Sequence, residues 1–226
     1  MTNENSPLPE TSLHDKLARL RAASCAEMPT PELAVMARTI ARLRRQGIQQ
    51  TCLQPGETVP DFEYINHDNA VGRFYETLKK GPAVLNFFRG YWCPYCRTEV
   101  EAYEAIQPEL DALGCTYFAI SPQKPSEPGS RGAGYEILFD KGNRIAHQFG
   151  IVYALIEEEK KLFASWGLHL DQVNESGTWE LPVPATFLVR QDRTIGYEFV
   201  DVDFRSRCCP DQLMQELRST CTCRSD

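Results

Sequence analysis

The chain has 226 residues, of which 42% are hydrophobic and 10% aromatic, which is enough to fill the core of a large domain and argues against a disordered chain. Its 24 basic and 31 acidic residues give a net charge of −7, which argues against nucleic acid or an anionic membrane as the main partner. Because no stretch approaches the roughly 20 apolar residues of a membrane span, and the polar N-terminus lacks the apolar core of a secretory signal, we expect a cytoplasmic protein.

Two helices are predicted near the N-terminus, after a polar lead of about ten residues that we expect to be disordered. In "TSLHDKLARLRAA" Ser12 can cap a helix that carries its leucines on one face. In "TPELAVMARTIARLRRQG" Thr30 can cap, Pro31 suits the first turn and Gly47 can end the helix. We therefore expect a helical hairpin, and assign residues 1–50 to an N-terminal helical extension.

Strands and helices alternate after a boundary rich in Pro and Gly near residues 54–64. The predicted strands, which are short and rich in apolar residues, occupy 82–88, 115–121, 134–140, 185–190 and 194–200. The predicted helices occupy 94–113, a short segment from Asn143, 151–167 and 210–218. This order predicts an α/β domain over 51–218, with a mixed sheet flanked by helices. An exposed loop is expected at 121–134, and a Cys-containing tail at 219–226.

The nine cysteines are Cys25, Cys52, Cys93, Cys96, Cys115, Cys208, Cys209, Cys221 and Cys223. An odd number of cysteines without a secretory signal is not typical of a structural disulfide framework. We therefore expect them to be free, metal-bound or redox-active.

The pair in "GYWCPYC" is the strongest candidate for chemistry. Pro94 suits the first helical position, which makes Cys93 the N-cap, where backbone N–H groups and the helix dipole favour a thiolate. Cysteines at such positions can fall from a pKa of about 8.5 to roughly 3.5–7.5. Cys96 lies one turn further on and is close enough to form a small disulfide. We expect Cys93 to attack and to be the more exposed of the two, and Cys96 to resolve the intermediate.

Two other interpretations of these residues stay open at this point. Arg89 and Arg97 are close enough in sequence to stabilise a thiolate, but either is equally compatible with an ordinary surface position. The CxxC spacing also suits half of a zinc site, with further ligands from Cys208 and Cys209 or from Cys221 and Cys223. Zinc-binding pairs usually lie in turns, whereas this pair opens a helix behind a buried strand, which favours redox chemistry.

The order strand, "GYWCPYC", helix resembles the thioredoxin superfamily. In "LPVPATFLV" Pro184 stands where these proteins place a cis-proline that faces the CxxC. "GETVPDFEY" and "ILFDKGNRIAHQFGI" are similar to the opening and middle segments of the AhpC/TSA peroxiredoxins. Residues 54–203 thus resemble the peroxiredoxin-like branch that carries a CPxC centre, and the N-terminal helices resemble the leader of its bacterial members.

This resemblance implies a thioredoxin-like fold and places Trp92, Arg89, Gly90 and Pro184 around the cysteine pair. The chain departs from typical peroxiredoxins at two of these positions. Gly90 replaces a Thr or Ser that hydrogen-bonds the peroxide, and Pro184 falls near the position of their active-site Arg. The resemblance therefore implies that two of the side chains with which peroxiredoxins activate the peroxide are replaced in this chain.

The resemblance also implies a thiol-dependent antioxidant oxidoreductase that reduces hydroperoxides through a Cys93/Cys96 dithiol–disulfide cycle, without a metal or cofactor. Thioredoxin, or glutathione with glutaredoxin, would be the reductant, and a homodimer is compatible with the resemblance. A protein disulfide reductase is the alternative, favoured by Gly90 and by the Pro-Tyr dipeptide that glutaredoxins share. A non-catalytic zinc-binding or interaction module is the third interpretation.

Overall fold

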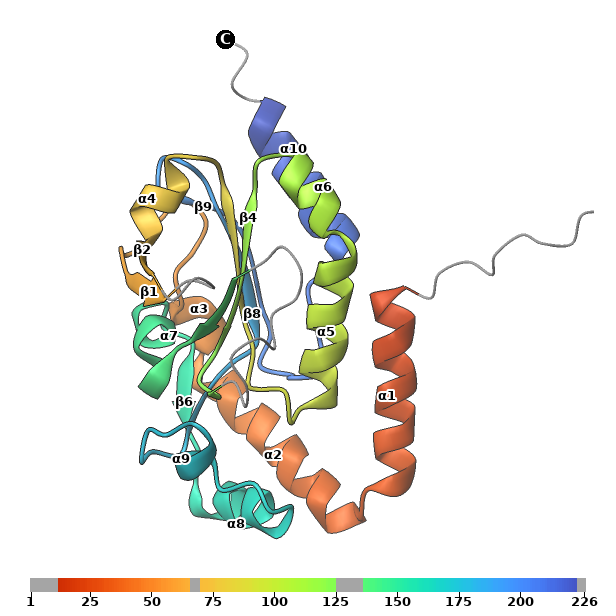
Figure 1. Ribbon diagram of the computed structural model, residues 1–226. Helices are drawn as coiled ribbons and strands as arrows, with labels where there is room; N and C mark the ends of the chain where they lie inside the picture. The colour runs from red at the N-terminus through yellow and green to blue at the C-terminus, as the bar shows by residue number, and fades with distance from the viewer. Residues whose placement is uncertain (1–11, 66–69, 125–135, 223–226) are drawn as a thin grey trace, which may run out of the picture.

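The central feature of the fold is a five-stranded sheet (Figure 1). The computed structural model describes residues 12–65, 70–124 and 136–222, so the polar lead, most of the predicted loop 121–134 and Cys223 lie outside the described residues. Across the sheet the strands are β5 (Glu136–Phe139), β4 (Thr116–Ser121), β3 (Ala83–Phe87), β8 (Ala185–Val189) and β9 (Ile195–Val200). β3, β4 and β5 run parallel, whereas β8 is antiparallel to β3 and β9. The predicted α/β fold with a mixed sheet is confirmed.

Helices cover both faces of the sheet, and each face has its own hydrophobic core (Figure 1). The helices on one face are α5 (Pro94–Ala105), α6 (Gln107–Ala112) and α10 (Pro210–Thr222). The helices on the other are α3 (Ile48–Thr51), α4 (Phe74–Leu78) and α7 (Arg144–Gln148). Val84 and Phe88 pack into the first core, whereas Leu85 and Phe87 pack into the second. The apolar run 82–88 is therefore buried throughout because its side chains point alternately to two cores.

The predicted N-terminal helices are present as α1 (Leu13–Glu27) and α2 (Thr30–Gln46), and α1 packs against the outer side of α5 (Figure 1). Ser12 caps α1 as expected, because its hydroxyl oxygen accepts a hydrogen bond from the Asp15 N–H at 3.2 Å. Helix α2 begins at Thr30, so Thr30 does not cap it. Gly47 ends α2 in the left-handed conformation, with φ of 71°.

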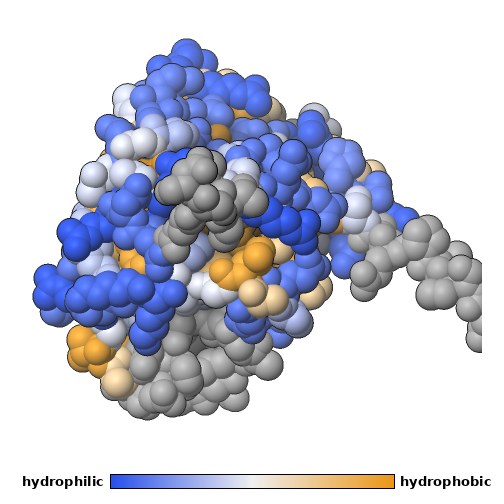
Figure 2. Space-filling model, turned by 90° about the horizontal axis from the view of Figure 1, so that it is seen from above, coloured by the Kyte–Doolittle hydropathy of each residue, from blue (hydrophilic) through white to orange (hydrophobic). Residues whose placement is uncertain are grey.

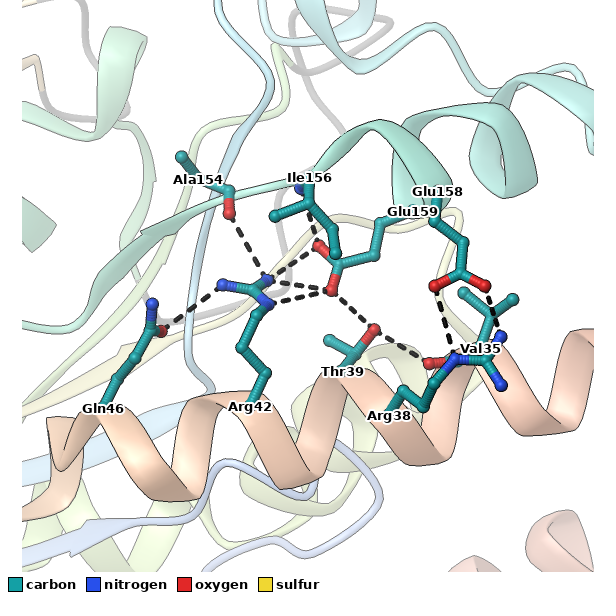
Figure 3. A network of polar contacts seen from close by, with 9 residues as sticks. All are labelled: Val35, Arg38, Thr39, Arg42, Gln46, Ala154, Ile156, Glu158 and Glu159. Atoms are coloured by element: carbon teal, nitrogen blue, oxygen red, sulfur yellow. Dashed lines mark hydrogen bonds and ion pairs between the residues drawn. The ribbon is translucent and has the colours of Figure 1, made fainter.

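A polar network joins α2 to α8 (Glu157–Ser165), as Figure 3 shows. The buried carboxylate of Glu159 accepts hydrogen bonds from the Thr39 hydroxyl at 2.7 Å and from Arg42 at 2.8 Å. It also accepts one from the Ile156 N–H at 3.0 Å, so the same side chain satisfies the start of α8. Glu158 and Arg38 form a second ion pair beside it, but both of these side chains are about half exposed. The network fixes α2 relative to α8.

The segment 151–167 differs from the predicted single helix. Its first part is β6 (Val152–Ala154), which pairs antiparallel with β7 (Glu180–Pro182), and the helix α8 starts only at Glu157. Ile151, Tyr153 and Leu155 are buried while the residues between them are not, which is the period-two pattern of a strand. The prediction was wrong here because the run of apolar residues was assigned the period of the helix that follows it.

The remaining elements are short. The predicted helix 94–113 is divided into α5 and α6 at Ile106, with Pro108 in the first turn of α6. Several short elements were not predicted from the sequence: α3, α4, β7, β1 (Glu63–Ile65), β2 (Val71–Arg73), the 3-10 helix η1 (Lys141–Asn143) and α9 (Leu170–Val173). No described helix is long and apolar enough to span a membrane. The face shown in Figure 2 is mainly hydrophilic, with its apolar residues in small separate patches.

Candidate active site

The cysteine pair lies where the chain leaves the central strand and enters α5. Cys93 is the N-cap of α5 and Pro94 is its first residue, as predicted. The Cys93 carbonyl accepts hydrogen bonds from the Cys96 and Arg97 N–H groups, both at 3.1 Å, which starts the helix. The positive end of the helix dipole therefore lies close to the Cys93 side chain.

Arg89 supplies the positive charge at Cys93. Its Nη2 donates a hydrogen bond to Cys93 Sγ at 3.0 Å, and its side chain is buried. The guanidinium carbon lies 4.1 Å from the centre of the Phe204 ring and 5.1 Å from that of Trp92, so two aromatic rings hold it in place. Arg97 is exposed and donates instead to the Tyr91 carbonyl at 3.0 Å. Of the two arginines that the sequence suggested, only Arg89 contacts the sulfur.

The electrostatic surroundings distinguish the two thiols. Burial alone would raise the pKa of Cys93, but its hydrogen bond with Cys96 and the charges of Arg89 and Arg207 hold that pKa well below its ordinary value. Burial, together with the hydrogen bond and charge of Cys93, raises the pKa of Cys96 well above its ordinary value. These surroundings therefore favour a thiolate at Cys93 and a thiol at Cys96.

Two further residues of the candidate site were not predicted from the sequence, and both belong to the surroundings of the second cysteine. Arg207 Nη2 donates a hydrogen bond to Cys96 Sγ at 3.2 Å, and Arg207 Nε pairs with Glu99 Oε2 at 2.7 Å. Burial raises the pKa of Glu99 to about 7, although the charge of Arg207 opposes this. A signal for Glu99 does exist, because it follows Cys96 by three residues and thus falls on the buried face of α5.

Both sulfur atoms are covered. The exposed fraction is 1% for Cys93 and 0% for Cys96, so Cys93 is the more exposed of the two as expected, but only marginally, because both residues are buried. The physical reason is that α1, α2 and α8 close over the start of α5. A pocket of about 250 Å³ remains between them, and Cys93 lines it while Cys96 does not. Its other walls are mainly apolar and include Met36, Phe163 and Trp166.

Sequence comparison identifies the family to which this site belongs. A model of the AhpC/TSA family matches residues 55–198. The chain belongs to the AhpC/TSA family. No curated protein matches the chain significantly.

Solved structures show the same fold for this AhpC/TSA protein. Peroxidoxin BcpB from Mycobacterium tuberculosis superimposes with a TM-score of 0.55 at 22% identity, covering 74% of this chain and 97% of that one. AhpC from Enterococcus faecalis gives a TM-score of 0.55 at 18% identity, covering 77% and 97%. A cysteine-to-serine mutant of peroxiredoxin 6 from Arenicola marina gives 0.56 at 16% identity, covering 74% and 73%. These likenesses establish the thioredoxin-like fold of the peroxiredoxins.

The residues at which the chain departs from peroxiredoxins have different roles in this AhpC/TSA protein. Gly90 has a φ of 147°, and a Cβ there would lie 2.5 Å from Trp92 Nε1, so the indole fills the space of a side chain at position 90. Pro184 shares a small buried cavity with Arg89. The guanidinium group beside Cys93 therefore belongs to Arg89, which precedes the CxxC, and not to an arginine at position 184.

The expectation of a cis-proline at Pro184 was wrong, since the described residues contain no cis peptide bond. The chain passes directly from β7, which ends at Pro182, into β8, which begins at Ala185. The Val183 N–H donates to the Ile151 carbonyl at 2.7 Å, which holds this link in an extended course. A trans peptide bond fits that course and is also the intrinsically preferred isomer.

The described residues contain no group of three His, Cys, Asp or Glu side chains that could hold a metal ion. Of the further zinc ligands considered for Cys93 and Cys96, Cys208 is buried, which raises its pKa to about 12. Cys93 and Cys96 face two guanidinium groups, and a cation site would need the opposite charge around it.

Proposed function

We propose that this AhpC/TSA protein is a thiol peroxidase that reduces small hydroperoxides through Cys93 and Cys96. The observation that carries the proposal is the position of the Cys93 thiolate, which is held by Arg89 at 3.0 Å and lines a pocket with mainly apolar walls. A thiolate is the nucleophilic form of cysteine, and a buried guanidinium keeps it ionised without solvent.

In the first step the Cys93 thiolate attacks the terminal oxygen of the hydroperoxide. A sulfur–oxygen bond forms, the oxygen–oxygen bond breaks, and the leaving alkoxide takes a proton to become an alcohol, or water if the substrate is hydrogen peroxide. Cys93 becomes a sulfenic acid. Arg89 is close enough to the sulfur to stabilise negative charge on the peroxide oxygens as the bond breaks.

In the second step Cys96 attacks the sulfenic sulfur. The disulfide bond forms, the sulfur–oxygen bond breaks, and the leaving hydroxide takes a proton to become water. An external thiol then supplies two electrons and restores both cysteines. Thioredoxin and glutathione with glutaredoxin are the reductants to be compared.

A protein disulfide reductase is the second candidate, and the burial of the pair argues against it. Both cysteines are at most 1% exposed, and the pocket of about 250 Å³ lies just below the range of roughly 300–1,000 Å³ that is usual for small-molecule sites. A folded protein would have to insert a segment between α1, α2 and α8 before its disulfide reached Cys93. A small hydroperoxide needs no such rearrangement.

The test is mass spectrometry after one equivalent of hydrogen peroxide, cumene hydroperoxide or glutathione disulfide. Cys96→Ser is expected to accumulate a sulfenic acid on Cys93 with the hydroperoxides, and Cys93→Ser to remain unmodified at Cys96. Cys209→Ser is the control, because it changes another cysteine at a helix start and should behave like the wild type. If hydroperoxides leave Cys93 unmodified while glutathione disulfide forms an adduct there, the protein is a disulfide reductase and not a peroxidase.

A further inference from the structure

Each sulfur of the cysteine pair has an arginine of its own. Arg89, just after β3, donates to Cys93, and Arg207, in the segment between β9 and α10, donates to Cys96. Glu99 pairs with Arg207 from the far side, and both of these side chains are only 1% exposed. The five groups form one buried cluster in which solvent cannot screen the charges.

The cluster has two permanent positive charges and three groups that can carry a negative one. The positive charges are permanent because the interactions with Cys93 and Glu99 raise the pKa of both arginines despite burial. A buried charge without a partner is costly. Two of the three acidic groups can therefore be ionised at once without excess charge, while ionisation of all three would leave one anion unpaired.

We propose that Glu99, acting through Arg207, keeps Cys96 protonated until Cys93 has reacted and then allows Cys96 to ionise. In the reduced protein Cys93 and Glu99 hold the two negative charges, so Cys96 remains a thiol. Conversion of Cys93 to a sulfenic acid removes one of these charges. Cys96 can then lose its proton, and its thiolate already lies beside Arg207.

The resolving step is then balanced in atoms and in charge. The Cys96 thiolate attacks the sulfenic sulfur, the disulfide bond forms, and hydroxide leaves. The proton that Cys96 released to solvent neutralises that hydroxide, so the step yields water and no net charge. Glu99 does not touch the reacting sulfur atoms and is a positioning residue, whereas Arg207 contacts Cys96 directly.

Two further titratable groups face Glu99, and neither changes this balance of charge. Burial raises the pKa of Tyr103 well above its ordinary value, and it raises that of Cys208 to about 12. Both are therefore neutral at physiological pH. The inference rests on the Cys93/Cys96 cycle of the proposed function, but its consequence for the reduced protein can be measured without any peroxide, so the two can fail separately.

The test is a thiolate titration of the reduced protein by ultraviolet absorbance, with Glu99→Gln compared to the wild type. Removing one anion should let Cys96 ionise at a pH about one unit or more lower, in the range by which a nearby charge shifts a pKa. In the double variant Glu99→Gln/Cys96→Ser, the absorbance change that comes from ionisation of Cys96 should be absent. Glu109→Gln, which breaks an exposed ion pair with Arg218, is the matched control and should leave the titration unchanged.

A purely structural role would make Glu99→Gln less stable and leave the Cys96 titration where it is in the wild type, which would overturn the proposal. A second measurement keeps the test decisive if that variant does not fold. When the pH of the wild type is lowered from neutral, infrared spectroscopy should detect protonation of the buried Glu99 carboxylate at a higher pH in the reduced form than in the disulfide form. Loss of the Cys93 charge leaves two arginines facing Glu99 alone, so Glu99 should stay ionised to a lower pH in the disulfide form; equal midpoints in the two forms would refute the coupling.

Discussion

The sequence resemblance aligns Gly90 with a hydroxyl side chain of the peroxiredoxins, and the surroundings of Gly90 leave no room for one. Its φ of 147° lies in a region that residues with a Cβ rarely adopt. A Cβ would also meet Trp92 Nε1 at 2.5 Å and Gln123 Oε1 at 2.7 Å. The Gln123 oxygen already accepts a hydrogen bond from the Tyr91 N–H at 2.6 Å, so it is not free to move away. The loop before Cys93 is therefore built around a glycine.

We predict that Gly90→Thr, which restores the peroxiredoxin residue, lowers both stability and peroxidase activity. Backbone strain of this kind costs about 1–3 kcal/mol, and displacement of Trp92 should also disturb Arg89. Urea unfolding and peroxide consumption measure the two effects. Gly114→Ala is the control, because Gly114 also has a positive φ, of 63°, but nothing lies near its missing side chain. A Gly90→Thr variant with raised activity would show that the loop can accept the hydroxyl.

For individual residues of the site, the sequence predicts contacts between neighbours along the chain and misses contacts between residues that are far apart in the sequence. The N-cap position of Cys93 follows from Pro94 and from the strand before it, and Arg89 is only four residues away. Arg207 is 111 residues from Cys96, and only the packing of the segment after β9 brings them together. No periodicity in the sequence reports such a contact, so the part of the charged cluster around Cys96 was not predicted.

Among the helices, the contact between α2 and α8 determines the shape of the pocket over Cys93, since both contribute residues to it. Glu159 is the centre of this contact, with a side chain that is 3% exposed and accepts hydrogen bonds from Arg42, Thr39 and the Ile156 N–H (Figure 3). Its removal would leave several buried donors without an acceptor.

We therefore predict that Glu159→Ala destabilises the protein by about 1–3 kcal/mol, the cost of buried polar groups without a partner. For a chain of this length that corresponds to a melting temperature lower by about 2–12 °C. Glu158→Ala is a matched control from the adjacent position, where the ion pair with Arg38 is exposed and worth about 0–1 kcal/mol. Thermal unfolding followed by circular dichroism measures the melting temperatures of both variants. Equal effects of the two variants would contradict the assignment of Glu159 as the anchor.

The helices and strands also differ in how well a sequence pattern predicts them. α2 and the central strands have long or strongly apolar patterns, and their predicted positions agree with the structure within a few residues. β6 and β7 have three residues each and exist because they pair with one another across 25 intervening residues. The turn at Ile106 between α5 and α6 likewise depends on packing and on Pro108, within a pattern that is helical on both sides.

The whole molecule encloses its reactive pair between an AhpC/TSA domain and the two N-terminal helices, of which α1 packs against α5 and α2 against α8. The family match starts at residue 55, whereas α1 and α2 precede it, and the chain before residue 55 supplies Ser24, Met28 and Met36 to the pocket wall. Tyr95, inside the CxxC, donates a hydrogen bond from its hydroxyl to Ser24 Oγ at 3.2 Å, which ties α1 to the start of α5. Burial of this kind makes the stability of the molecule depend on the charge of Cys93.

The last prediction follows from that dependence: the disulfide form should be less stable than the reduced form. Disulfide formation removes the Cys93 anion and leaves one buried cation in excess, which costs about 3–5 kcal/mol. The CxxC disulfide closes a loop of only four residues, so it restricts the unfolded chain little and stabilises the folded protein by only about 2 kcal/mol. The balance of about 1–3 kcal/mol should lower the melting temperature of the oxidised protein by about 2–12 °C.

Calorimetry of the fully reduced and fully oxidised protein measures this difference directly. Arg89→Met should reverse the order, because the oxidised form then has no cation in excess and keeps the Arg207–Glu99 pair intact, while Cys93 of the reduced form loses the charge that stabilised its thiolate and takes up a proton. A disulfide that destabilises the fold is also readily reduced, which suits the proposed cycle, in which an external thiol regenerates the pair. If the oxidised wild type proves the more stable, the thiolate does not balance the charge of Arg89 in the folded protein.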